Sequence, residues 1–233
     1  MKVRVVLYIG LIILVVGCSA KDTRLGGERK MPDGSVFVDS KAQFLVKSPP
    51  ALDLPDARLN IEWTHQGGNA QHYSGHVALS SDLTLQWVTA IGQGDGRRSE
   101  MSASPVIQGD RIFTLDSKSL VTALRLDGSV IWQRNVSEAY SDVNEAFGGG
   151  LAVQGNNLFV TTGFGTVLAL SVLSGEVYWE QDLTSFGGAS PTVVDDLLYV
   201  PTRDGAAWAI ETSTGRVKWQ VIGQSVQSNY TGG

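Results

Sequence analysis

The chain has 233 residues, of which 18 are Lys or Arg and 23 are Asp or Glu, so its formal net charge at pH 7 is −5. An acidic chain without a run of basic residues is a poor candidate for nucleic-acid binding, because phosphate contacts need clustered Lys and Arg. Its single cysteine excludes an intrachain disulfide.

Residues 1–17 have the pattern of a lipoprotein signal peptide. A basic start is followed by an apolar run from Val5 to Val16, and Gly17 precedes Cys18. The run is short for a membrane span. Its end resembles the bacterial lipobox, in which a small residue precedes a cysteine that is lipidated after cleavage. We therefore expect a lipid on Cys18. The alternative is an ordinary signal peptide, or a short anchor, in which the cysteine is incidental.

The next segment, residues 18–58, is polar and rich in Lys, Asp, Gly and Pro. This composition is typical of a tether. We interpret it as a lipidated N-terminus and flexible linker, and residues 59–233 as the folded part. Ser19 follows the cysteine, which in lipoproteins of this kind resembles a signal for sorting to the outer membrane.

All three histidines, His65, His72 and His76, lie in one short segment. Three imidazoles could bind zinc. However, their spacing matches no rigid ligand motif, and a glycine pair between them indicates a loop. The other interpretation is a hydrogen-bonding loop that seats the tether on the folded part.

A tryptophan ends a near-identical phrase three times, at Trp132, Trp179 and Trp219, and Trp87 ends a weaker copy. The steps between these tryptophans are 45, 47 and 40 residues. Repetition at this period indicates a solenoid, a propeller or an array.

Each copy contains four short predicted strands. In the second copy we place them at Gly150–Gln154, Asn157–Thr162, Thr166–Val172 and Glu176–Gln181, with no sustained helical period. Four-stranded meanders of this length fit the blades of a β-propeller, so we expect an all-β fold.

Two residue types in the repeat have structural explanations. The tryptophans are expected to pack between blades, without chemistry of their own. The turn before each last strand carries a glycine, because tight hairpin loops favour positive φ. These glycines are Gly128, Gly175 and Gly215.

The spacing Ala-x-x-x-x-(Thr/Ser)-Gly-x-x-x-Trp, at Ala169–Trp179 and Ala209–Trp219, resembles the repeat of quinoprotein-type propellers. Such repeats occur in eight-bladed PQQ-dependent dehydrogenases and in BamB. With the lipobox and the polar tether, the chain resembles the BamB family of outer-membrane assembly lipoproteins. Leu85–Gly94 is similar to the start of that family's first blade. The resemblance covers residues 60–233, about half of a full-length member.

This resemblance implies three or four PQQ-like blades of an expected eight, so we expect that the natural chain continues beyond Gly233 or that another chain completes the ring. It also implies a non-catalytic scaffold on the periplasmic face of the outer membrane, without a cofactor, that works with the barrel subunit BamA and nascent outer-membrane proteins. The loop after Trp219 would contact the partner through Val226 and Tyr230. The other possibilities are a fragment of a PQQ-dependent periplasmic dehydrogenase and a propeller lipoprotein with a different envelope partner. No nucleophile elbow or placed acid pair favours catalysis.

Overall fold

The computed structural model describes residues 53–97, 99–137, 146–183, 185 and 189–223. All of them belong to the second of two units, which spans residues 53–233. Within these residues every regular element is a strand. No helix that could cross a membrane occurs in the described part. The predicted signal peptide, residues 1–17, and most of the predicted tether lie outside the described residues.

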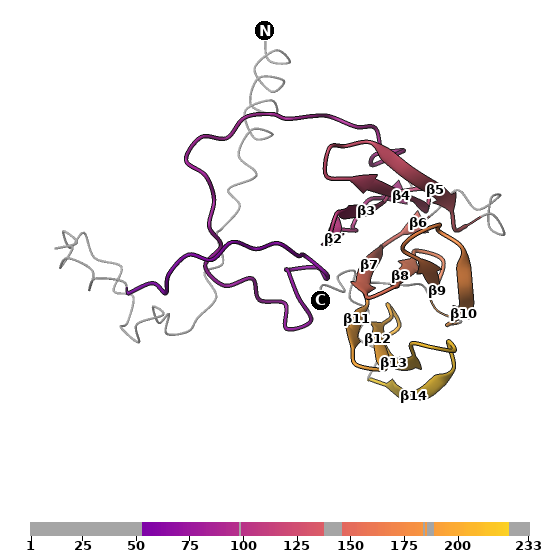
Figure 1. The fold of residues 1–233 in the computed structure, drawn as a ribbon. Coiled ribbons are helices and arrows are strands. Elements are labelled where there is room, and N and C mark those ends of the chain that lie inside the picture. Colours follow the sequence, from indigo (N-terminus) through magenta and orange to yellow (C-terminus); the bar gives the residue numbers. More distant parts are fainter. Residues whose placement is uncertain (1–52, 98, 138–145, 184, 186–188, 224–233) are drawn as a thin grey trace, which may run out of the picture. The chain divides into compact units, whose positions relative to one another are not determined.

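Three consecutive four-stranded sheets form the core of this unit (Figure 1). Each is an antiparallel meander in which neighbours in sequence pair in space, which is the topology of a propeller blade. The first blade consists of β2 (Val106–Gln108), β3 (Arg111–Leu115), β4 (Leu120–Arg125) and β5 (Val130–Asn135). The second consists of β7 (Gly149–Gln154), β8 (Asn157–Thr162), β9 (Thr166–Ser171) and β10 (Val177–Asp182). The third consists of β11 (Thr192–Val194), β12 (Leu197–Pro201), β13 (Ala206–Glu211) and β14 (Val217–Ile222).

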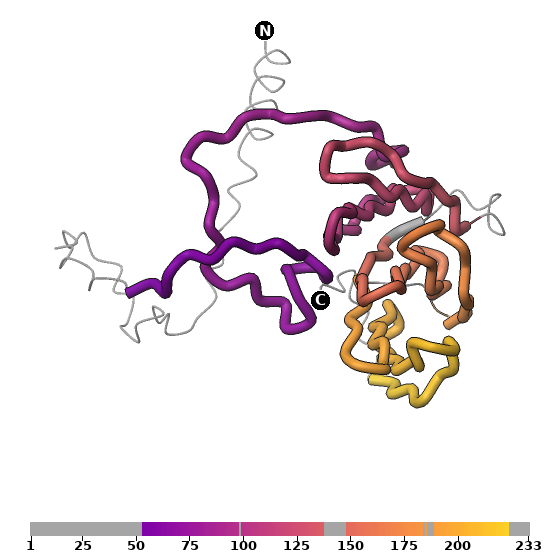
Figure 2. Tube along the Cα trace, in the orientation of Figure 1, coloured from indigo at the N-terminus to yellow at the C-terminus, as the bar shows by residue number. Residues whose placement is uncertain are grey.

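Two very short strands, β1 (Ser99–Glu100) and β6 (Ala146–Phe147), pair in parallel. The three blades follow one another along the chain (Figure 2). Their first strands are neighbours, with β7 beside both β2 and β11. The all-β propeller fold predicted from the repeat is therefore confirmed. In the second blade the predicted strands agree with the observed ones to within one residue at each end.

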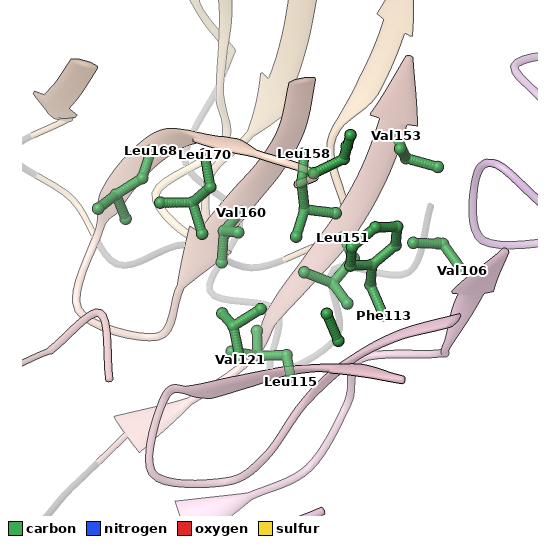
Figure 3. Packing of buried hydrophobic residues seen from close by; sticks show 12 residues of the cluster. Val106, Phe113, Leu115, Val121, Leu151, Val153, Leu158, Val160, Leu168 and Leu170 are labelled. Atoms are coloured by element: carbon green, nitrogen blue, oxygen red, sulfur yellow. The ribbon is translucent and has the colours of Figure 1, made fainter. Parts of the chain in front are cut away.

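The middle blade is buried on both faces, because successive side chains of a strand point to opposite sides of the sheet. Leu151, Leu158 and Leu170 pack against the first blade, in a cluster with Phe113 and Val121. Figure 3 shows these side chains gathered between the two sheets. The alternate residues of the same strands turn the other way.

These alternate residues of the middle blade form a second cluster with the third blade. Ala152, Phe159 and Ala169 contact the side that includes Leu198 and Ile210. Each apolar core thus lies between two blades. A blade of this kind is stabilised mainly by its neighbours, as in other repeat architectures.

Candidate functional site

The junctions between blades share one arrangement, in which a tryptophan of one repeat contacts the last turn of the next. The indole Nε1–H of each tryptophan donates a hydrogen bond to a backbone carbonyl of that turn. The bonds run from Trp87 to Leu126 at 2.8 Å, from Trp132 to Val172 at 3.2 Å and from Trp179 to Thr212 at 2.8 Å. The weak fourth copy of the repeat therefore places Trp87 in the same role as its stronger relatives.

A glycine lies under each of these indole rings. A Cβ added at Gly175 would lie 2.7 Å from the ring of Trp132, and one at Gly215 would lie 2.7 Å from the ring of Trp179. Both glycines are buried and adopt positive φ, 71° and 73°. The repeat thus needs glycine for two reasons, the turn conformation and the close approach of the ring. Gly128 stands in the same relation to Trp87.

Within each blade the tryptophan completes a row of three side chains across the sheet. In the second blade Ala169 pairs with Phe159 on one side and with Trp179 on the other. The two rings meet over the small alanine with their centroids 6.1 Å apart and their planes tilted by 40°. Tilted aromatic pairs of this kind are favourable. The same row recurs as Phe113, Ala123 and Trp132, and as Tyr199, Ala209 and Trp219.

The histidine segment lies against the first strands of the blades. His65 is buried, and its Nε2 lies 3.1 Å from the backbone nitrogen of Val193 and 3.2 Å from the carbonyl oxygen of that residue. His72 is exposed, yet its Nε2 lies 3.0 Å from the hydroxyl of Thr192 in the same strand, β11. Two of the three histidines therefore attach this segment to the third blade.

The zinc interpretation of these histidines is not supported by the geometry. His76 bonds to the carbonyl of Pro55 at 2.7 Å, away from the partners of His65 and His72. Among the described residues, no group of three or more His, Cys, Asp or Glu side chains is placed to hold a metal ion. The segment instead has the hydrogen-bonding role that the sequence left as the other interpretation. A left-handed turn at Gly67 and Gly68 gives it its shape.

Burial lowers the pKa of the His65 imidazole below its ordinary value, since the charged form is disfavoured away from water. The bond to the Val193 backbone opposes this shift, and the nearby His72 adds to it. The surroundings of His65 therefore favour its neutral form.

A buried carboxylate, Asp116, holds the glycine-rich segment Gly92–Gly96, which precedes the first blade. It accepts hydrogen bonds from the backbone N–H groups of Gln93, Lys118 and Leu120 at 2.8, 2.8 and 2.7 Å. Gly92 packs so closely on this carboxylate that a Cβ there would overlap it. Nothing in the sequence indicated Asp116, because its bond to Gln93 joins residues that are 23 positions apart.

Two open hollows, about 360 and 320 Å³, lie along residues 55–76. Both are lined by Asn69 and Ser74. The Asn69 side chain bonds to the backbone of Gln71 and Tyr73, so its polar groups shape the loop. No arrangement of a nucleophile beside a base is evident in these linings.

The second and third blades lie within residues 140–230, which match the family model described as "Outer membrane protein assembly factor BamB". This segment is therefore similar to the BamB family.

Curated BamB proteins align with a large part of this chain. It is 30% identical over 141 residues to the outer membrane protein assembly factor BamB of Yersinia pestis, which covers 58% of this chain and 36% of that protein. It is 28% identical over 153 residues to BamB of Moranella endobia, covering 63% of this chain and 39% of that protein. The chain therefore spans little more than a third of the length of these BamB relatives.

Solved structures support the fold assignment. The quinohemoprotein alcohol dehydrogenase from Comamonas testosteroni superposes with a TM-score of 0.57 at 22% identity, covering 71% of this chain and 28% of that one. At this identity the likeness concerns the propeller fold alone.

Three of the predicted site residues, Cys18, Val226 and Tyr230, lie outside the described residues. The lipid on Cys18 and the partner contact through the loop after Trp219 therefore stay predictions.

Proposed function

We propose that this chain is a non-catalytic propeller scaffold of the machinery that inserts β-barrel proteins into the outer membrane. The match of residues 140–230 to the BamB family model carries the proposal. The curated relatives support it, since they are named outer membrane protein assembly factors.

The blade junctions fit such a role physically. Indole hydrogen bonds and ring-to-glycine contacts fix each blade to the next. Surface loops on such a framework generally tolerate changes of sequence. A rigid framework with variable loops is suited to holding partners.

We further propose that the protein is held at the periplasmic face of the outer membrane by a lipid on Cys18. Several acyl chains give stable anchoring, whereas one gives only marginal binding. Mass spectrometry of the mature N-terminus tests this. A mature protein that starts at Cys18 with added diacylglycerol supports it, and a retained Met1 or an unmodified Cys18 refutes it. Cys18→Ala is the control that should leave the protein unlipidated.

The proposed partners are BamA and nascent outer-membrane proteins, with Val226 and Tyr230 in the contact. The test is capture of purified BamA by the full-length protein carrying Val226→Asp and Tyr230→Asp. A matched control changes the exposed Leu173 and Tyr178, in the second blade, to aspartate. Loss of capture only in the first double variant, with unchanged circular dichroism, supports a contact between this loop and BamA. Undiminished capture shows that Val226 and Tyr230 are not part of the contact.

Deletion of the gene tests the function as a whole. We expect lower levels of folded porin trimers in the outer membrane, restored by the full-length gene. A PQQ-dependent dehydrogenase is the competing function, because enzymes of that class share the propeller fold. The scaffold function would be refuted if the protein bound PQQ stoichiometrically with Ca²⁺ and oxidised an alcohol or a sugar, and if the deletion left porin levels unchanged.

A further inference from the structure

Three consecutive residues before the first blade each bond to the first strand of a different blade. The backbone N–H of Ile107 in β2 donates to the carbonyl of Trp63 at 2.7 Å. The N–H of Val153 in β7 donates to the carbonyl of Thr64 at 2.9 Å. The N–H of Val193 in β11 lies 3.1 Å from Nε2 of His65.

The three acceptor residues meet equivalent positions of the repeat. Ile107, Val153 and Val193 are each the next-to-last residue of the first strand of their blade. Each of these strands is the edge of its sheet, so the N–H in question points away from the sheet. An edge N–H without a partner is costly when it is buried. Residues 63–65 supply the three partners in order, one per blade.

The third partner differs from the first two, because it is a side chain and not a backbone carbonyl. The carbonyl of His65 is already used by the N–H of Gly68 at 3.0 Å, in the turn that follows. The imidazole of His65 therefore takes the place of this carbonyl as the partner of the Val193 N–H. Nδ1 of the same ring lies 2.9 Å from the hydroxyl of Thr64, which orients the ring toward Val193.

We propose that residues 63–65 form a clamp that couples the three blades into one cooperative unit, with His65 holding the third blade. The clamp uses other residues than the tryptophan junctions. It bonds to three blades at once, whereas each junction joins only two. The alternative is that each bond merely satisfies its own N–H group.

Hydrogen exchange of the full-length protein distinguishes these two cases. In His65→Ala the clamp predicts that amides throughout β11–β14 exchange faster, by roughly tenfold for the loss of one net hydrogen bond and its coupling. Amides of β2–β5 and β7–β10 should change much less. His65→Gln should restore protection, because a primary amide can accept from the N–H of Val193 and donate to its carbonyl.

The control variant is His76→Ala, which removes a bond to Pro55 outside the blades and should leave the exchange of all three blades unchanged. If only the Val193 amide responds to His65→Ala, or if no amide responds, the clamp is overturned.

A readout without any variant covers the case in which His65→Ala fails to fold. In native-state exchange of the wild type at rising urea, the amides of Ile107, Val153 and Val193 should lose protection in one shared opening event. Three separate opening free energies would overturn the proposal.

Discussion

Gly175 lies directly beneath the indole of Trp132, the tryptophan that ends the preceding blade. The nearest ring carbon is 2.7 Å from the point that a Cβ of residue 175 would occupy. The indole nitrogen of the same ring donates to Val172, three residues earlier in the chain. One turn of the second blade thus provides both the surface and the acceptor for the tryptophan of the first.

Gly175→Ala should therefore destabilise the protein by roughly 2–4 kcal/mol. An alanine at φ 71° has a backbone penalty, and its methyl group would displace the ring. Urea denaturation followed by circular dichroism measures the change.

Gly155→Ala is the matched control for this substitution. Gly155 also has positive φ, 58°, but its added Cβ would meet nothing within 4 Å. Gly155→Ala should lower the free energy of unfolding by only about 1 kcal/mol, which is the cost of positive φ for alanine. Equal losses in the two variants would show that the ring contact contributes nothing.

Trp179→Phe should lower the free energy of unfolding by about 1–3 kcal/mol. Phenylalanine keeps a ring over Gly215 but removes the N–H that donates to Thr212 at 2.8 Å, leaving that carbonyl without its partner. Tyr178→Phe, at the exposed neighbouring position of β10, is the control and should be nearly neutral. A neutral Trp179→Phe variant would contradict a role for the indole hydrogen bond.

The fold could be read from the sequence because its information is local and repeated. The tryptophan period and the glycine four residues before each of Trp132, Trp179 and Trp219 place the strands of the second blade to within one residue. Each repeat specifies its own hairpins, so the same residues recur in the same places.

The contacts that join the repeats could not be read in this way. His65 and Val193 are separated by 128 residues, and no periodicity relates them. The cluster of histidines indicated a polar loop, but the identity of its partner depends on how the blades stack. The glycine under Trp132 was likewise predicted only as a turn residue, because its second role involves a different repeat.

Asp116→Ala should destabilise the protein by roughly 2–4 kcal/mol, since three backbone N–H groups lose their acceptor in a buried place. Asp110→Ala is the control in the same blade. Asp110 is exposed and pairs with Arg111 at 3.1 Å, so its loss should stay within about 0.5 kcal/mol. Urea midpoints compare the two variants, and similar values would contradict the fastening role of Asp116.

Stability should fall as the pH decreases from 7.5 to 5.5, in part because of His65. Its pKa in the folded protein is below the ordinary value of 6.5. The unfolded chain therefore takes up a proton at a higher pH than the folded one. The contribution of the neutral imidazole is fully present above the unfolded pKa and is lost as the pH falls toward the folded pKa. For one proton this loss is at most about 1.4 kcal/mol per pH unit.

Urea denaturation at pH 7.5, 6.5 and 5.5 tests this with His65→Gln as the reference, because glutamine can accept a hydrogen bond from the N–H of Val193 but does not titrate. The other titratable group that affects the ring is His72, and it is present in both proteins. We expect the wild type to lose more stability than His65→Gln over this range. Parallel pH profiles would mean that His65 binds its proton equally well in the folded and unfolded chains, and that its burial against β11 has no energetic consequence.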